Sequence, residues 1–188
     1  MEEITFNLLN DPWIPCEMLS GEYESLNMKD VLFNAQDIKE ITSENPLVMI
    51  SIYRLLLTIL HRNFGPENKD KWISIYRAGK WDKEVLEAYF KKWHHKFEIF
   101  NEPENRFYQN DISKIVKKKT LITKLDYCIS SGNNTSLFDH HWDSDITALP
   151  VENAVQLLVS YQNYSVSGLG GFLYQGDKKK GIIFLTLH

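Results

Sequence analysis

Short apolar stretches alternate with turn-forming residues at the start of the chain. Apolar residues dominate 6–9 and 13–16 and stand at both ends of 23–26, and Asn, Asp, Pro, Ser and Gly residues separate these stretches. Strand-length apolar stretches bounded by such residues are typical of β-hairpins. The pattern therefore predicts a short strand over 6–9 followed by an N-terminal hairpin. Because proline cannot donate to a strand ladder, we expect Pro12 and Pro15 at sheet edges.

The longest apolar stretch, residues 46–63, predicts the central helix of the fold. Asn45 supplies a capping side chain, Pro46 suits the first helical turn, and Gly65 with Pro66 ends the helix. Apolar residues lie almost all around this segment, which is typical of a helix buried on every side. Polar residues interrupt it before it reaches the ~20 apolar residues that a membrane span needs. We therefore expect a buried helix of a soluble protein.

Shorter helices are predicted around this central one. The signals are N-cap residues, prolines in the first turn and apolar residues three or four positions apart. They place helices over 28–35, 72–77, 82–93 and 150–164, and a final strand over 182–187. Together these elements predict an α+β fold in which several helices pack around a central buried helix, with an N-terminal β-hairpin and a small antiparallel sheet. Because the final strand lacks an evident partner, we expect residues 1–188 to be the N-terminal, incomplete domain of a longer protein.

Charge and cysteine content narrow the class of protein. The formal net charge is −4, so we do not expect the chain to coat DNA by bulk electrostatics. Cys16 and Cys128 form no CxxC pair, which disfavours a structural zinc site or a disulfide framework and suits a reducing cytoplasm. The first residues show no signal-peptide pattern. The sequence therefore predicts a cytoplasmic protein that has no membrane segment.

The densest group of possible metal ligands lies between Asp139 and Asp145. A metal-dependent phosphoesterase would use Asp139, His140 and His141 to hold a divalent ion that activates water. Adjacent histidines do not readily point at one ion, and no second ligand set lies nearby at helical spacing. The chain also lacks the GxSxG, GxxxxGK[ST] and GxGxxG motifs. We therefore expect no catalytic residue, no metal and no cofactor, and keep the phosphoesterase as an alternative.

Two segments of the chain combine a loop with a run of lysines. Residues 129–146 form a long polar stretch, of a length that is typical of functional or disordered loops. A second loop carries glycines whose main-chain groups can approach a ligand closely, as a minor groove requires. A flexible connector and a solvated charged face are the alternative interpretations. The glycines are Gly168, Gly170 and Gly171, and the candidate phosphate contacts are Lys117, Lys118, Lys119, Lys178, Lys179 and Lys180.

Five motifs occur in an order that matches a known family. The first, over residues 6–15, contains Asn-Leu-Leu, an acidic residue and Trp-Ile-Pro. The others are residues 55–62, 97–100 with 106–109, 132–140, and a helix over 154–158 that is followed by the glycine loop. In this order they resemble the large subunit of the type I-E CRISPR surveillance complex, the CasA family of Cascade.

The resemblance implies a non-catalytic subunit with nucleic-acid partners. The loop over 132–141 would dock among guide RNA and the backbone and small subunits of the complex, with Phe138 engaging RNA. The glycine loop would approach target DNA from the minor groove, beside the short PAM motif. The nuclease-helicase would bind only through a C-terminal helical bundle that lies beyond this chain. The docking residues implied by the match are Asn133, Asn134, Leu137, Phe138 and His140. A module that binds only other proteins is the second alternative that the residues leave open.

Overall fold

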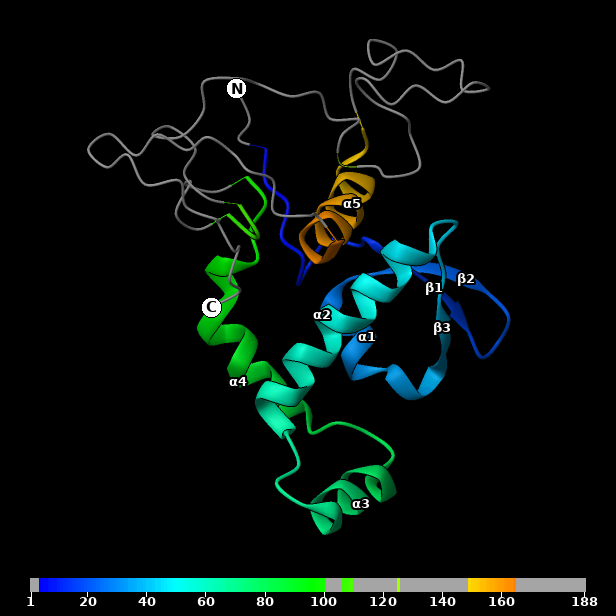
Figure 1. Ribbon diagram of the computed structural model, residues 1–188, viewed down its shortest axis with the longest axis vertical. Coiled ribbons are helices and arrows are strands. Elements are labelled where there is room, and N and C mark those ends of the chain that lie inside the picture. Colours follow the sequence, from blue (N-terminus) through cyan, green and yellow to red (C-terminus); the bar gives the residue numbers. More distant parts are fainter. Residues whose placement is uncertain (1–3, 101–105, 110–124, 126–148, 165–188) are drawn as a thin grey trace, which may run out of the picture.

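A computed structural model describes residues 4–100, 106–109, 125 and 149–164 of the chain. In Figure 1, α2 runs through the middle, the sheet and α1 lie on one side of it, α4 lies on the other, and α3 is at the end farthest from α5. The described part is therefore an α+β arrangement around a central helix, as the sequence predicts. The elements are β1 (Ile14–Met18), β2 (Tyr23–Leu26), α1 (Met28–Phe33), a 3-10 turn (Ala35–Asp37), β3 (Ile38–Ile41), α2 (Pro46–Phe64), α3 (Lys69–Ala78), α4 (Lys83–Trp93), a 3-10 turn (His94–Lys96) and α5 (Val151–Tyr164).

The small sheet is antiparallel, with the strand order β2-β1-β3. The predicted hairpin is confirmed as β1 and β2, which pair from Ile14 with Leu26 to Glu17 with Tyr23. The edge position predicted for Pro15 is wrong, because β1 is the central strand. The ladder between β1 and β3 begins only at Cys16, and the Pro15 carbonyl accepts the backbone N–H of Thr42 at 2.8 Å. The missing N–H of Pro15 therefore falls just outside that ladder, where it breaks no strand pairing.

The strand predicted over residues 6–9 is wrong, because a turn built on Asn7 takes its place. Asn7 makes a single bridge to Glu98, and its backbone carbonyl then accepts the N–H groups of Asn10 and Asp11. Its side chain accepts the Leu9 N–H at 2.9 Å and donates to the Glu98 carboxylate at 2.6 Å. An amide side chain that bonds to its own neighbouring backbone competes with a strand ladder.

Trp13 fixes the same turn from within the core. Its side chain is fully buried, and its indole N–H donates to the carbonyl of Leu8 at 3.1 Å. Leu8 and Leu9 are fully buried as well. The Asn-Leu-Leu and Trp residues of the first family motif are thus packed inside the molecule, so in this chain they build the fold rather than a binding surface.

Most helix boundaries follow the predicted capping residues. Asn27, Asn45 and Asp82 each accept a backbone N–H from the first turn of the following helix. Gly79 ends α3 in the left-handed region, at φ 64°, which favours glycine. The helix predicted over 72–77 begins earlier in the structure, because the side chain of Asn68 caps it.

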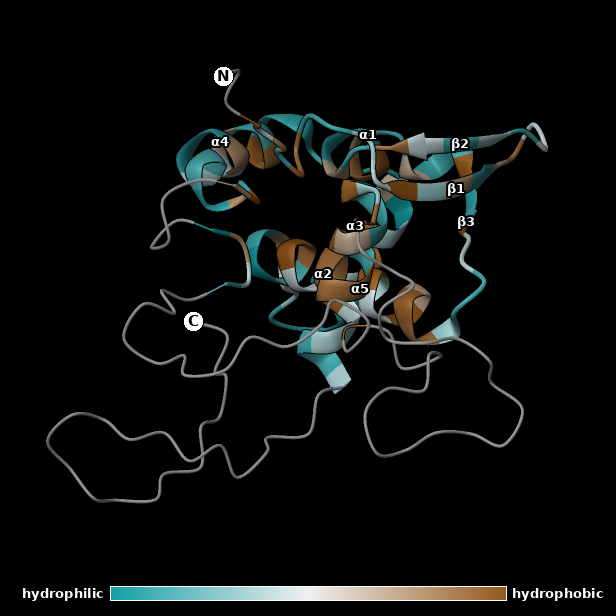
Figure 2. Ribbon diagram, turned by 90° about the horizontal axis from the view of Figure 1, so that it is seen from above, coloured by the Kyte–Doolittle hydropathy of each residue, from teal (hydrophilic) through white to brown (hydrophobic). Residues whose placement is uncertain are grey.

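The central helix α2 is buried on one face only, so the prediction of burial on every side is wrong for the described residues. The buried face carries Val48, Ser51, Ile52, Leu55, Leu56 and Ile59, and it packs against α5 and α4. Figure 2 shows apolar residues of α2 and α5 meeting in the interior. On the outer face, Ile50 and Leu57 keep 43% and 60% of their surface exposed. By length and composition alone α2 could cross a membrane, but its buried face is part of the protein core.

Candidate nucleic-acid interface

The residues that the sequence predicts for nucleic-acid contact lie outside the described part of the chain. The same is true of the alternative metal ligands Asp139, His140 and His141. The predicted contacts concerned are Lys117, Lys118, Lys119, Asn133, Asn134, Leu137, Phe138, His140, Gly168, Gly170, Gly171, Lys178, Lys179 and Lys180. Within the described residues, no three His, Cys, Asp or Glu side chains are grouped so that they could hold a metal. The structure does describe the residues next to these segments. It therefore shows where the segments connect to the fold.

Two of these points are held together by one hydrogen bond. Residues 106–109 lead directly into the segment that carries Phe138, and α5 leads directly into the segment that carries Gly170. The side-chain amide of Gln162, in the last turn of α5, donates to the carbonyl of Tyr108 at 3.0 Å. The described residues that precede one of these segments therefore lie beside the described residues that precede the other. We call this place, formed by residues 106–109 and the last turn of α5, the junction.

Aromatic packing fixes the 106–109 side of the junction. Phe107 is buried and stacks on Phe97, with ring centroids 5.9 Å apart. The backbone N–H of Phe107 donates to the Glu98 carbonyl at 2.7 Å, and the Gln109 side chain donates to the Ile99 carbonyl at 3.1 Å. Residues 106–109 are thus attached along the 97–99 segment, which fixes the position of the chain up to residue 109.

Tyr108 has an uncommon backbone conformation at this point. Its φ is 54°, in the left-handed region that non-glycine residues rarely occupy. The ring stacks on Phe107 at a centroid distance of 4.2 Å, and burial raises the pKa of the Tyr108 hydroxyl, an effect that nearby Arg54 opposes. Backbone strain of this kind persists where the surroundings impose it, and it is found disproportionately at functional sites.

Helix α5 sets the distance between residue 109 and residue 149. Its buried face, with Val155 and Val159, packs on α2, and the Gln156 side chain donates to the Trp13 carbonyl at 2.8 Å. At 1.5 Å per residue, a helix of 14 residues is about 21 Å long. The segment over 110–148 therefore starts near the C-terminal end of α5 and rejoins the fold about 20 Å away, at its N-terminal end.

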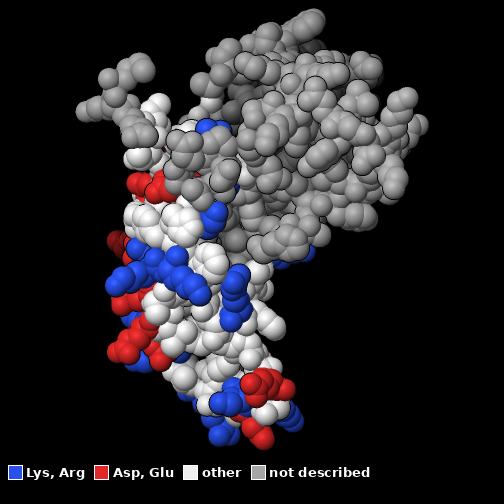
Figure 3. All heavy atoms as spheres, turned by 90° about the vertical axis from the view of Figure 1, so that its left-hand side faces the viewer, with Lys and Arg blue, Asp and Glu red and all other residues white. Residues whose placement is uncertain are grey.

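The sequence analysis did not predict the basic surface on α4. Figure 3 shows Lys and Arg side chains gathered on the face that α4 forms, with acidic side chains beside them. The Arg62 guanidinium lies 5.2 Å from the Trp93 ring centre and 5.8 Å from that of Tyr89, and the Lys92 ammonium lies 5.3 Å from Trp93. Lys91 and Lys92 lie between aromatic residues in the sequence, and this pattern could have indicated the basic surface. Cations that stack on rings are held at a fixed surface position.

Comparison with known proteins gives the family. The family model of CRISPR-associated protein Cse1 matches residues 7–185. The CRISPR-associated protein CasA/Cse1 of Thermus thermophilus is 28% identical over 166 residues, which cover 87% of this chain and 32% of that protein. The chain belongs to the Cse1 family, also called CasA, and spans about a third of the length of the curated relative that it matches.

Solved structures agree with this assignment. The chain resembles Thermobifida fusca Cse1 with a TM-score of 0.73 at 21% identity, covering 88% of this chain and 31% of that one. It also resembles a chain of a CRISPR RNA-guided surveillance complex in a pre-nicking state, with a TM-score of 0.76 at 26% identity, covering 88% and 35%. The first likeness shows the fold, and the second is to a protein within an RNA-guided complex.

Proposed function

We propose that the chain is a non-catalytic part of the large subunit of a CRISPR interference complex, in the cytoplasm. In that role it docks on the guide-RNA-bearing backbone and small subunits and contributes to PAM recognition in target DNA. Residues 1–188 then form part of a larger N-terminal domain, and the nuclease-helicase contacts other parts of the subunit. Family membership and the likeness to a chain of a surveillance complex support this assignment.

The observation that carries the proposal is the hydrogen bond between Gln162 and Tyr108. It joins Tyr108, which precedes the segment with Phe138, to Gln162, which precedes the segment with the glycines. Two segments that leave the fold side by side would then make the RNA contact and the DNA contact. This suits guided effectors, in which base pairing reads the target and protein reads only the PAM.

The proposal assigns separate tasks to the two segments, so two substitutions test it in a reconstituted complex. Phe138→Ala should weaken assembly with guide RNA by the ~1–3 kcal/mol typical of base–aromatic stacking. Phe100→Ala is the matched control, because Phe100 is an exposed phenylalanine that lies outside both segments. Gly170→Val adds side-chain bulk where a minor groove would approach, so it should weaken binding of a duplex with a cognate PAM and leave assembly intact.

The alternatives give different results in the same assays. Equal loss of PAM and non-PAM duplexes on Gly170→Val would make the glycine loop a structural element and contradict the proposal. Normal assembly of the Phe138→Ala complex would favour a module that contacts only proteins. Metal-dependent cleavage of nucleic acid that disappears on His140→Ala would establish the phosphoesterase.

A further inference from the structure

Helix α3 presents a pair of stacked aromatic rings to solvent. Trp72 and Tyr76 lie one turn apart, and their rings are nearly parallel, at an angle of 8° with centroids 5.3 Å apart. Their exposed fractions are 54% and 73%, and α3 contains no buried residue at all. Soluble proteins rarely expose neighbouring large aromatic side chains without a binding function.

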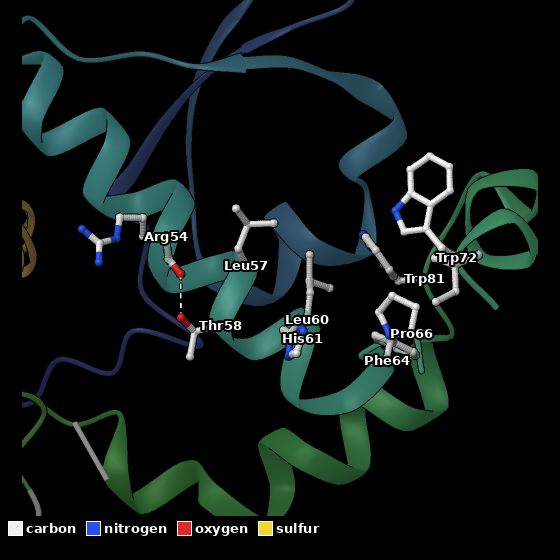
Figure 4. A pocket seen from close by; sticks show the side chains of 10 residues that line it. Arg54, Leu57, Thr58, Leu60, His61, Phe64, Pro66, Trp72 and Trp81 are labelled. Atoms are coloured by element: carbon white, nitrogen blue, oxygen red, sulfur yellow. Dashed lines mark hydrogen bonds between the residues drawn. The ribbon is translucent and has the colours of Figure 1, made fainter. Parts of the chain in front are cut away.

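A cavity of about 570 Å³ opens beside this aromatic pair. Trp72 forms part of its wall, together with Phe64, Pro66 and Trp81, while Arg54 and His61 line it from α2. Figure 4 shows these side chains arranged around the space between α2 and α3. Tyr76 covers one face of the Trp72 ring, and Trp72 borders the cavity. A planar group that entered the cavity would contact the Trp72 ring.

Cationic side chains surround the same helix. Residues 66–81, which contain α3 and the cavity residues Pro66 and Trp81, carry four cations and two carboxylates, Glu67 and Asp70, in a chain whose formal net charge is −4. All four cations are exposed, and none of them forms an ion pair or ring contact with another described residue. The core of a protein interface is typically depleted of lysine, whereas surfaces that bind single strands combine exposed rings with basic side chains, so the three lysines favour a polyanionic ligand. The cations are Lys69, Lys71, Arg77 and Lys80.

We infer that α3 and the adjoining cavity form a binding site for single-stranded nucleic acid. A base stacks on Trp72 within the cavity, and the neighbouring phosphates contact the lysines and Arg77. The strand is single because paired bases do not present their faces for stacking. Aromatic platforms that are flanked by basic side chains bind single strands in this way, with little sequence preference. Because α3 lies at the opposite end of the molecule from α5 and the junction, the site is independent of the proposed function (Figure 1).

Binding of a fluorescein-labelled oligo(dT) to the complete chain, followed by fluorescence anisotropy, tests the site. Trp72→Ala should weaken binding about tenfold, which is within the range typical of the loss of one stacked base. Trp72→Phe should keep most of the affinity, because it retains a ring. Tyr23→Ala is the matched control and should leave the affinity unchanged, since Tyr23 is 72% exposed but lies in β2. Circular dichroism of each variant checks that it is folded.

Salt dependence separates phosphate binding from stacking. For a single strand, the slope of log K against log salt decreases in magnitude by about 0.7 for each phosphate that is no longer neutralised. Lys69→Gln and Lys80→Gln should each lower the slope, whereas Trp72→Ala should lower affinity at every salt concentration. If the chain does not bind oligo(dT), or binds equally well after Trp72→Ala, the inference is wrong. If binding were lost only in a variant that lacks Lys117, Lys118 and Lys119, the oligo(dT) site would lie at those lysines and not on α3. If Trp72→Ala disrupted only the association with another subunit, α3 would be a protein-docking surface.

Discussion

The sheet region and the α3 region place the same side chain in opposite environments. Trp13, at the sheet, is fully buried and donates its indole N–H to a backbone carbonyl. Trp72, on α3, keeps more than half of its surface exposed and stacks on another exposed ring. The sheet region completes its own core. In the described part of the chain, the rings of α3 stay largely exposed, which suits the binding role that we infer for them.

The two environments meet around a single helix. One face of α2 is buried against α5 and α4, while its outer face reaches the α3 cavity through residues such as Leu57 and His61. Helix packing and ligand contact are therefore divided between two faces of one element. A substitution on α2 should affect stability or binding according to the face that it alters.

The largest expected difference between the regions is in stability. Trp13→Ala removes a fully buried indole and leaves the Leu8 carbonyl without this donor, so it should lower the free energy of unfolding by roughly 3–5 kcal/mol. Trp72→Ala should lower it by less than about 1 kcal/mol, because an exposed ring loses little packing. Urea unfolding of both variants measures the difference. Equal losses would show that α3 belongs to the folding core and would remove the distinction between the two regions.

The junction should respond to a smaller change. Gln162→Ala removes the hydrogen bond to Tyr108 and should cost about 1 kcal/mol, with faster hydrogen exchange at the amides of Phe107 and Gln109. Gln156→Ala is the matched control, since this glutamine lies on the same helix and donates to Trp13 instead. Its effect on exchange should fall near Trp13. If both variants raised the hydrogen-exchange rates of residues 106–109 equally, the bond between Gln162 and Tyr108 would not be what holds the junction.

The smallest effect concerns the pH dependence of the sheet region. Burial, with an added contribution from the charge of Glu24, raises the pKa of the Cys16 thiol to about 11. The unfolded chain loses this proton near pH 8.5, at about the ordinary cysteine value, so ionisation favours unfolding at higher pH. Stability from this group is therefore complete below about pH 8.5 and is lost as pH rises towards 11.

A substitution isolates the Cys16 contribution. Cys16→Ala should flatten the decline in unfolding free energy over that pH range. Burial also raises the pKa values of Tyr89 and Tyr108, so part of the decline should remain in this variant. An unchanged slope after Cys16→Ala would mean that the thiol ionises equally easily in the folded protein.

Local signals in the sequence predicted most helices, because a cap involves only neighbouring residues. Asn45 and Asp82 are recognisable from the next few positions alone, and the structure confirms both. Strand β3 was missed because Ile38–Ile41 is short, carries charged Lys39 and Glu40, and becomes a strand only by pairing with β1. The one-sided burial of α2 was missed because an apolar residue does not reveal whether anything covers it.

The candidate sites were less predictable for a related reason. The junction depends on a contact between Tyr108 and Gln162, which lie 54 residues apart, and neither residue has a motif of its own. The stack on α3 is visible in outline, as two aromatic residues four positions apart between lysines. Whether these rings can bind a ligand depends on their exposure to solvent, which the sequence does not give. The pattern alone therefore predicts only an ordinary short helix. The residues that the family resemblance indicates remain predictions.

The three-stranded sheet has a consequence for how the protein behaves in a crowded assembly. Among the described residues, β2 and β3 are its outer strands, yet β3 carries Lys39 and Glu40, β2 carries Glu24, and the pairing of β1 with β3 shifts register between Glu17 and Met18. Charged side chains and such irregularities prevent sheets from joining edge to edge. We therefore expect this sheet to stay three strands wide among neighbouring chains, so that unwanted fibre growth does not begin there.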